Sequence, residues 1–159
     1  MRQLILLRHA EAEPAQPGAG DIDRPLTDRG RLEAVAAAEA IATAQLHIDE
    51  VLASPAVRSR ETAGLVAARL NLAMPVNHVA ALYLGAPNAL LLALQNCRPA
   101  VQTLLMIGHN PGISELAHRL ARAAQGVALR TAGVCRLTWP HDCWDQVGTT
   151  DAGAFEVLR

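Results

Sequence analysis

The hydrophobic and polar positions of this sequence follow two alternating patterns. The first pattern is a short, mostly aliphatic run, and it occurs at residues 4–7, 50–53 and 103–108. Such runs are too short and too uniformly apolar for amphipathic helices, and they are typical of strands buried on both faces. A further short strand is predicted over residues 76–79.

The second pattern is a longer segment in which apolar residues recur at helical spacing. Helices are predicted over residues 28–45, 57–71, 87–95 and 110–126. Thr27 and Asn110 are the predicted N-caps of two of them, and Pro111 suits a first helical position. Strands that alternate with helices predict an α/β fold with a mostly parallel sheet.

The end of the chain follows a different pattern. Residues 134–139 alternate between apolar and polar with period two, and residues 155–158 do so weakly. This pattern predicts antiparallel edge strands, with Trp139 and Trp144 packed against them. The whole chain is therefore expected to form a three-layer αβα sandwich with helices on both faces of the sheet. No linker or repeat divides it, so residues 1–159 are expected to form a single domain.

Composition narrows the possible partners and the compartment. The net charge is −1 and no basic run occurs, so neither nucleic acid nor an anionic membrane is an expected partner. No segment approaches the ~18 apolar residues that a membrane span requires. Three cysteines (Cys97, Cys135 and Cys143) without CxxC spacing indicate buried or half-buried free thiols and a cytoplasmic protein.

Candidate chemistry lies where the predicted strands end. The first strand runs directly into Arg8 and His9, and the strand over residues 103–108 runs into His109. Ligands of open α/β sheets bind outside the carboxyl ends of the strands. If these two strands are neighbours, both histidines face one crevice. Arg58 follows the strand over residues 50–53 and would join them.

A cluster of two arginines and two histidines favours a phosphoryl group as ligand. The guanidinium fork of arginine matches phosphate oxygens two at a time. A neutral histidine can act as a nucleophile, and a protonated ring nitrogen can donate to a phosphate oxygen. Each residue alone could equally be structural, so the prediction depends on their joint placement.

Four segments, taken in order, resemble the motifs of the histidine phosphatase superfamily, which is also called phosphoglycerate mutase-like. They are Leu-Leu-Arg-His-Ala-Glu-Ala-Glu-Pro, Arg-Pro-Leu-Thr-Asp-Arg-Gly, Ser-Pro-Ala-Val-Arg-Ser-Arg-Glu-Thr-Ala and Ile-Gly-His-Asn-Pro-Gly. The short chain and the Arg-His-Ala form resemble the SixA-type phosphohistidine phosphatases of that superfamily. Residues 131–133 resemble a further segment of the same subgroup.

The resemblance implies a role for each matched residue. His9 would be the nucleophile, and the phosphohistidine it forms would be hydrolysed by water. Arg8 and Arg58 would hold the phosphoryl oxygens, while His109 would donate a hydrogen bond to the same group. Arg60 is assigned to the surface or to the rim of the substrate site. The superfamily works without a metal or another cofactor, and no set of metal-ligating residues stands near this cluster in the sequence.

One departure from the larger members bears on the substrate. Those members place a proton-donating acid in an interval that corresponds to residues 63–110, where this chain has no Asp or Glu. General acid help is worth about 10²–10⁴-fold, so a poor alkoxide leaving group should leave slowly. The leaving nitrogen of phosphohistidine is a far better leaving group once it is protonated. Glu11, Asp21 or Asp23 could supply the acid instead, although Asp23 beside Arg24 is more simply an ion pair.

The sequence therefore predicts a phosphatase that acts on phosphohistidine of a partner protein, such as a histidine-phosphotransfer domain or a phosphocarrier. Two alternatives stay open at this point. One is a broad small-molecule phosphomonoesterase, and the other is a phosphate-binding regulatory module without turnover.

Overall fold

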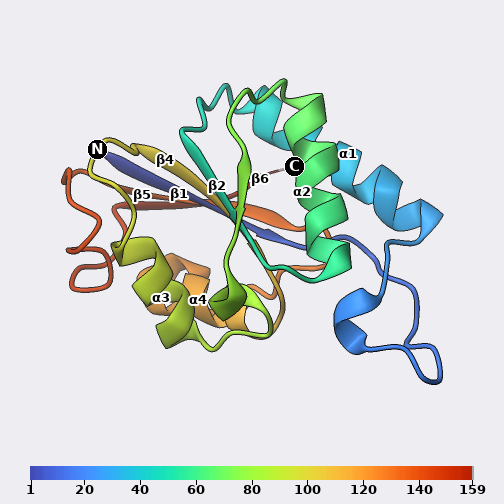
Figure 1. The fold of residues 1–159 in the computed structure, drawn as a ribbon. Coiled ribbons are helices and arrows are strands. Elements are labelled where there is room, and N and C mark those ends of the chain that lie inside the picture. The colour runs from blue at the N-terminus through green and yellow to red at the C-terminus, as the bar shows by residue number, and fades with distance from the viewer. Residues whose placement is uncertain (159) are drawn as a thin grey trace.

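The computed structural model describes residues 1–158, whose strands form one six-stranded sheet (Figure 1). The strands are β1 (Arg2–Arg8), β2 (Glu50–Ala53), β3 (Val76–His78), β4 (Thr103–Gly108), β5 (Val134–Trp139) and β6 (Ala154–Leu158). Their order across the sheet is β3-β2-β4-β1-β5-β6. The first four strands are parallel, whereas β5 is antiparallel to β1 and β6 is antiparallel to β5. The mostly parallel sheet with an antiparallel edge strand is confirmed, although of the two antiparallel strands only β6 lies at the edge, because β5 pairs with both β1 and β6.

Helices cover both faces of this sheet, so the predicted three-layer sandwich is confirmed (Figure 1). The α-helices are α1 (Asp28–Thr43), α2 (Val57–Arg69), α3 (Pro87–Gln95) and α4 (Gly112–Leu120). Three short 3₁₀ helices also occur, namely η1 (Asp21–Asp23), η2 (Ala80–Leu82) and η3 (Arg122–Ala124). Helices α1 and α2 pack together on one face, and α3 and α4 pack together on the other.

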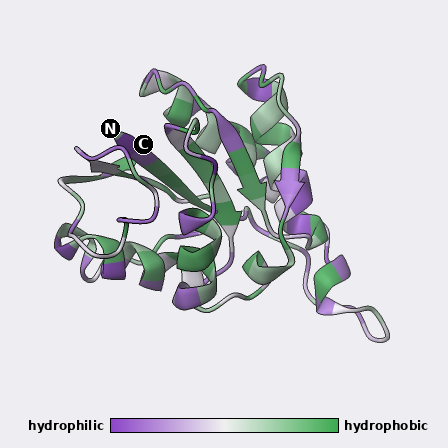
Figure 2. Ribbon diagram, turned by 60° about the vertical axis from the view of Figure 1, so that its left-hand side comes forward, coloured by the Kyte–Doolittle hydropathy of each residue, from purple (hydrophilic) through white to green (hydrophobic). Residues whose placement is uncertain are grey.

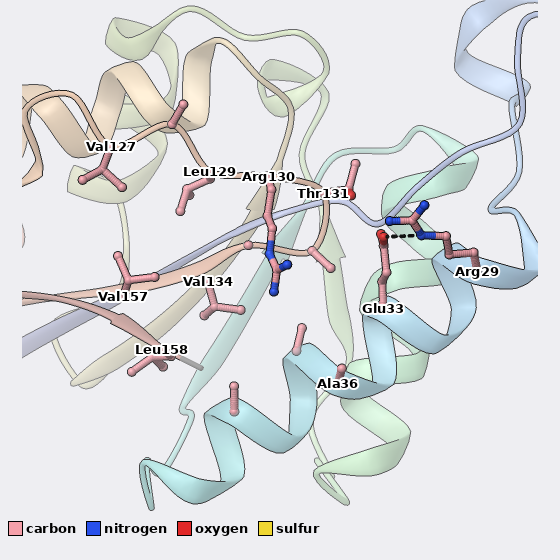
Figure 3. Close-up of a pocket in the computed structure, with 15 residues that line it drawn as sticks. Arg29, Glu33, Ala36, Val127, Leu129, Arg130, Thr131, Val134, Val157 and Leu158 are labelled. Carbon is pink, nitrogen blue, oxygen red and sulfur yellow. Dashed lines mark ion pairs between the residues drawn. The ribbon is translucent and has the colours of Figure 1, made fainter.

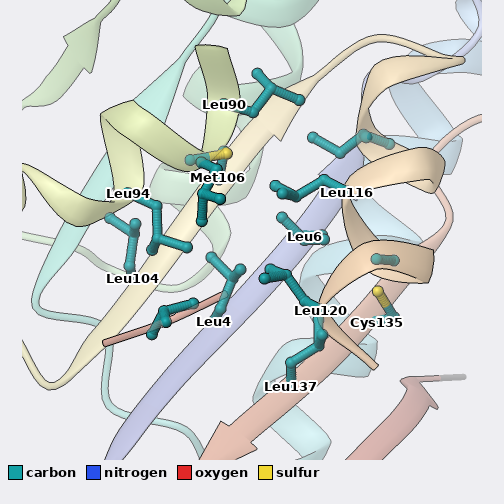
Figure 4. Packing of buried hydrophobic residues seen from close by; sticks show 14 of the residues in the cluster. Leu4, Leu6, Leu90, Leu94, Leu104, Met106, Leu116, Leu120, Cys135 and Leu137 are labelled. Atoms are coloured by element: carbon teal, nitrogen blue, oxygen red, sulfur yellow. The ribbon is translucent and has the colours of Figure 1, made fainter. Parts of the chain in front are cut away.

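Strand β1 lies in the centre of the core and is buried on both faces. Leu4 and Leu6 belong to the core beneath α3 and α4, where Leu90 and Leu116 meet them (Figure 4). Ile5 and Leu7 point to the opposite face and belong to the core beneath α1 and α2. In Figure 2 the central strands are correspondingly hydrophobic along their length. This burial explains why the strand reads as an unbroken aliphatic run.

Of the two predicted helix N-caps, one is confirmed and one is wrong. The side chain of Thr27 accepts from the backbone N–H of Gly30 at 2.9 Å. Helix α4 instead begins at Gly112, with Pro111 at its N-cap and no side-chain cap. The side chain of Asn110 is used elsewhere, because it donates to the backbone oxygen of Leu129 at 2.8 Å.

The predicted end of the last helix is also wrong. Helix α4 stops at Leu120 instead of near Gly126, because Ala121 adopts an extended backbone conformation and η3 follows it. The expected packing of Trp139 and Trp144 is confirmed, since both are buried in the core beneath α3 and α4.

All three cysteines are free thiols, as expected, but they differ in exposure. Cys135 is buried and Cys97 is half-buried, whereas Cys143 is exposed, contrary to the expectation of burial. No helix within residues 1–158 is long and apolar enough to cross a membrane.

Gly30 in α1 and Gly64 in α2 provide a matched test of how α1 is held. A Cβ added at Gly30 would clash with the backbone oxygen of Glu11, whereas one at Gly64 would meet open space. We expect Gly30→Ala to lower the free energy of unfolding by about 1–3 kcal/mol through overpacking. Gly64→Ala should raise it by roughly 0.5–1 kcal/mol through helix propensity. Urea denaturation measures both changes, and equal stability of the two variants would contradict this account.

Candidate active site

The two predicted histidines emerge side by side from neighbouring strands. Strands β1 and β4 are adjacent and parallel, with Arg8 opposite Gly108. The pairing continues one step further, because the backbone N–H of His9 donates to the oxygen of Gly108 at 3.0 Å. The imidazole centroids of His9 and His109 are consequently 4.9 Å apart. The expectation that these strands are neighbours is confirmed.

Arg58 reaches the same place from the other side of β4. Strand β2 pairs with β4, and helix α2 begins at Val57, so Arg58 lies in its first turn. Its side chain is almost completely buried, and its Nε donates to Nε2 of His9 at 3.3 Å. The structure therefore brings together a guanidinium and two imidazoles that are widely separated in the sequence.

Arg8 lies at the edge of this cluster. It is half-buried, and its Nη1 donates to the backbone oxygen of Leu129 at 3.1 Å. Its Nε is buried and has no hydrogen-bond partner within residues 1–158. The charge of Arg8 acts on the cluster, because it lowers the pKa of both His9 and His109.

The hydrogen bonds of His9 define which ring nitrogen carries the proton. Its Nδ1 lies 2.8 Å from the backbone oxygen of Ala10. A carbonyl oxygen can only accept, so Nδ1 is the protonated nitrogen. Nε2 is then unprotonated, and its lone pair accepts the hydrogen bond from Arg58. The tautomer of His9 thus leaves Nε2 as a nucleophilic atom.

His109 is only 3% exposed and is held by the segment that follows β2. Its Nε2 lies 2.7 Å from Oγ of Ser54 and 3.4 Å from Oγ of Ser59. The ring of Tyr83 meets it edge-on at a centroid distance of 5.6 Å. Its other nitrogen, Nδ1, is buried and has no hydrogen-bond partner in the described part of the chain.

Both imidazoles are held neutral. Burial lowers the pKa of His9 to about 4, with the nearby positive charges of Arg58 and Arg8 acting in the same direction. Burial lowers the pKa of His109 to about 3, with His9 and Arg58 acting in the same direction. At neutral pH the cluster therefore combines two uncharged imidazoles with two permanent cations. This arrangement suits an anionic ligand attacked by a neutral nitrogen.

Asp21 is the loop carboxylate that enters the site. Its Oδ2 accepts from Nη2 of Arg58 at 2.9 Å and from the hydroxyl of Tyr83 at 2.8 Å. Its backbone oxygen accepts from Nη1 of Arg58 at 2.6 Å. Arg24 donates to Oδ1 at 2.9 Å, so the predicted ion pair between Asp23 and Arg24 is wrong and Asp21 takes that place.

These donors keep Asp21 ionised. Hydrogen bonds from Arg24 and Tyr83, and then from Arg58, hold the pKa of the Asp21 carboxyl well below its usual range. Glu11, another candidate acid on this loop, points to Arg29 at 3.3 Å. Among the candidate acids Glu11, Asp21 and Asp23, Asp21 is thus the one that contacts a predicted site residue, Arg58, within residues 1–158.

Sequence reasoning missed three residues of the site. Ser54 directly follows the last residue of β2, which is the same kind of strand-end position that His9 and His109 occupy. Ser59 sits one residue after Arg58, and Tyr83 is the single tyrosine of the chain. No sequence spacing identifies either residue as part of the site. Tyr83, for example, reaches the site only through the tertiary position of η2.

Two hollows lie outside this cluster. A groove of about 800 Å³ lies between α1, the segment 127–134 and the end of β6 (Figure 3). None of the four predicted site residues lines it. A smaller hollow of about 520 Å³ lies beside α2, and Arg60 is one of its lining residues. Arg60 is exposed, which agrees with the expected surface position. Residues 1–158 hold no group of three or more His, Cys, Asp or Glu side chains placed to hold a metal ion.

Comparison with known proteins identifies the family. A sequence model of the histidine phosphatase superfamily (branch 1) matches residues 4–83, the segment that carries Arg8, His9 and Arg58. The chain belongs to the histidine phosphatase superfamily. An uncharacterized protein from Picosynechococcus sp. is 30% identical over 138 residues, which cover 85% of this chain and 84% of that protein.

Solved structures of SixA proteins share the fold of this histidine phosphatase superfamily member. A SixA protein from Agrobacterium tumefaciens has a TM-score of 0.77 and 28% identity, and the match covers 86% of this chain and 90% of that one. A protein histidine phosphatase SixA complexed with tungstate has a TM-score of 0.81 and 25% identity, and the match covers 98% and 96%. The predicted phosphoglycerate mutase-like fold and the SixA-type resemblance are confirmed.

The two neutral histidines predict how stability depends on pH. Their folded-state pKa values of about 4 and about 3 lie below the ordinary 6.5, so the unfolded chain binds more protons between pH 6.5 and about 3. Stability is fully present above pH 6.5 and decreases as the pH falls through this window. Each of the two groups contributes on the order of 2 kcal/mol, so we expect the free energy of unfolding to drop by roughly 3–4 kcal/mol between about pH 7 and about pH 5.

Urea denaturation at the two pH values measures this drop. The variant His109→Gln should show a smaller drop, because it removes one of the two shifted groups. His47→Gln is the matched control, since His47 is exposed and lies outside the cluster. An equal drop in the wild type and in His109→Gln would contradict the assignment to His109.

Proposed function

We propose that this protein hydrolyses phosphohistidine on a partner protein through a phosphohistidine enzyme intermediate. Membership of the superfamily and the likeness to SixA structures support phosphatase activity. The proposal goes further in naming the substrate, the intermediate and the roles of the four clustered residues. It also treats residues 1–159 as a single histidine phosphatase domain that acts in the cytoplasm, which agrees with its three free cysteines.

In the proposed first step, Arg8 and Arg58 hold the oxygens of the substrate phosphoryl group. Nε2 of His9 attacks the phosphorus atom, and the bond between phosphorus and the substrate imidazole breaks as the new bond forms. His109 donates a hydrogen bond to a phosphoryl oxygen, whose charge it stabilises. The leaving nitrogen of the substrate histidine takes the electron pair of the broken bond, and the imidazole departs neutral because its other ring nitrogen already carries a proton taken from solvent. In the second step water attacks the phosphorus, so inorganic phosphate is released and His9 is regenerated.

The ionised state of Asp21 is the observation that favours phosphohistidine as substrate. Asp21 is the carboxylate in contact with Arg58, and its low pKa leaves it without a proton to donate at neutral pH. An alkoxide leaving group needs such a proton, whereas phosphohistidine can take up a proton from solvent on its other ring nitrogen before the bond to phosphorus breaks. A site with strong cations and no protonated acid therefore suits a phosphoramidate better than an ester.

The partner is proposed to be a protein that carries phosphohistidine, such as a histidine-phosphotransfer domain or a phosphocarrier. The second candidate is a small-molecule phosphomonoesterase. The position of Asp21 favours it, because a carboxylate at this place could serve as the acid if it acquired a proton. A binding module without turnover fits less well, because binding alone would not need a neutral imidazole beside the cations, as His9 is beside Arg58.

We expect rapid phosphate release from a histidine-phosphorylated carrier protein and slow release from a panel of phosphate monoesters. His9→Ala should abolish release, since it removes the attacking nitrogen, while inorganic phosphate still binds to Arg8 and Arg58. His78→Ala is the matched control, because His78 is an exposed histidine outside the cluster. Parent-rate turnover by His9→Ala would refute the assigned nucleophile, and faster release from esters would favour the second candidate.

The variant Asp21→Asn distinguishes the two candidate functions, because only one of them needs Asp21 as an acid. If Asp21 is not an acid, phosphohistidine turnover should stay within about threefold of the wild type, far less than the 10²–10⁴-fold that a general acid contributes. Inorganic phosphate should inhibit the variant more strongly, because the carboxylate no longer competes for Arg58. Asp23→Asn on the same 3₁₀ helix is the matched control. Steady-state kinetics measure both effects, and a loss of 10²-fold or more in Asp21→Asn alone would make Asp21 the acid.

A further inference from the structure

Ser54 occupies a buried position directly beneath His109. It follows the last residue of β2, and its backbone N–H extends the pairing with β4 by donating to Ile107 at 3.0 Å. Its side chain is completely buried. The 2.7 Å contact between its Oγ and Nε2 of His109 is the shortest that either ring nitrogen makes within residues 1–158.

The proton of the Ser54 hydroxyl can be assigned by counting donors and acceptors. Oγ already accepts from the backbone N–H of Ala56 at 3.3 Å. Its own proton needs an acceptor, and within residues 1–158 the acceptor in reach is Nε2 of His109. If Nε2 carried a proton instead, Oγ would receive two donors and its buried proton would have no acceptor, which is costly.

We propose that Ser54 is a positioning residue that fixes the ring orientation of His109 and its Nδ1-protonated tautomer. The hydroxyl of Ser54 donates to Nε2, so the ring proton resides on Nδ1. The low pKa of His109 agrees with a neutral ring, which has one ring proton to place. This inference deepens the proposed function, because it assigns the atom through which His109 would meet the substrate.

The consequence concerns the nitrogen that the protein leaves unpaired. Nδ1 of His109 is buried and has no partner in the described residues. A buried donor without a partner costs free energy, and a phosphoryl oxygen would satisfy it. The hydrogen bond from Ser54 to Nε2 thus aims a neutral N–H donor at the ligand, which a freely rotating ring would not do.

Ser59 provides a comparison within the same site. Its Oγ is 3.4 Å from the same Nε2, and its side chain is also buried. At that distance its hydrogen bond is weak, so it should not hold the tautomer alone. Loss of the hydroxyl at Ser54 should therefore matter more than loss of the hydroxyl at Ser59.

Nuclear magnetic resonance of the ring nitrogens tests the proposal on the ligand-free wild type. We expect Nδ1 of His109 to be protonated and Nε2 to be unprotonated at neutral pH, with the signals assigned by comparison with His109→Gln. A wild-type His109 protonated on Nε2 would overturn the proposal. This measurement needs no turnover, so it can fail or succeed whether or not the protein is a phosphohistidine phosphatase.

Variants at the two serines extend the test. Ser54→Ala should shift His109 toward the Nε2-protonated tautomer, while Ser59→Ala should retain the wild-type tautomer. Phosphate release by Ser54→Ala should fall by about tenfold, less than the roughly 10²–10³-fold that loss of a charge-stabilising donor costs. Ser54→Thr, which retains the hydroxyl, should restore the tautomer and most of the rate. An unchanged His109 tautomer in a folded Ser54→Ala would refute the role of Ser54, and the wild-type spectrum decides the matter if that variant does not fold.

Discussion

The parallel pairing of β1 with β4 is the contact on which the candidate active site depends. These strands are about a hundred residues apart in the sequence, yet their register places Arg8 opposite Gly108 and so brings His9 beside His109. A shift by one residue would turn every side chain of β1 to the other face of the sheet. Such a shift is opposed by both cores, because Leu4 and Ile5 are buried on opposite faces. The position of the two imidazoles is therefore a consequence of core packing.

The same placement determines the charge state of the site. Strand ends in the middle of a covered sheet are poorly hydrated, and this desolvation lowers the pKa of His9 and His109. The buried cation of Arg58 needs a counter-charge, which Asp21 supplies through its carboxylate and its backbone oxygen. A phosphoryl group presents the same kind of charge to the same guanidinium. In the ligand-free protein, Asp21 thus supplies the negative charge beside Arg58 that a bound phosphoryl group would supply in its place.

The sequence allowed prediction of those parts of the molecule that local pattern determines. The strand over residues 103–108 and the cap at Thr27 were predictable, because burial and capping depend on neighbouring residues. The cap at Asn110 was predicted wrongly, since its amide is drawn to a carbonyl 19 residues away. The partner of Arg58 is 37 residues away on a loop whose path no local pattern determines, so sequence reasoning could name Asp21 only as one of three candidates.

The sheet and the loop after β1 bear on two different aspects of function, namely attack on the phosphoryl group and release of the leaving group. In the proposed mechanism, the strand ends and the first turn of α2 place the nucleophile, the cations and the donor, and these would act on any phosphoryl group whatever its leaving group. The leaving group would be served by the loop between β1 and α1, which contributes Asp21 and lies outside the sheet. A fold alone does not fix the substrate, because sites with different specificity are built on one scaffold. Under the proposed mechanism, substrate preference would therefore depend on whether the carboxylate of Asp21 is protonated, and the three hydrogen bonds that it accepts favour its ionised form.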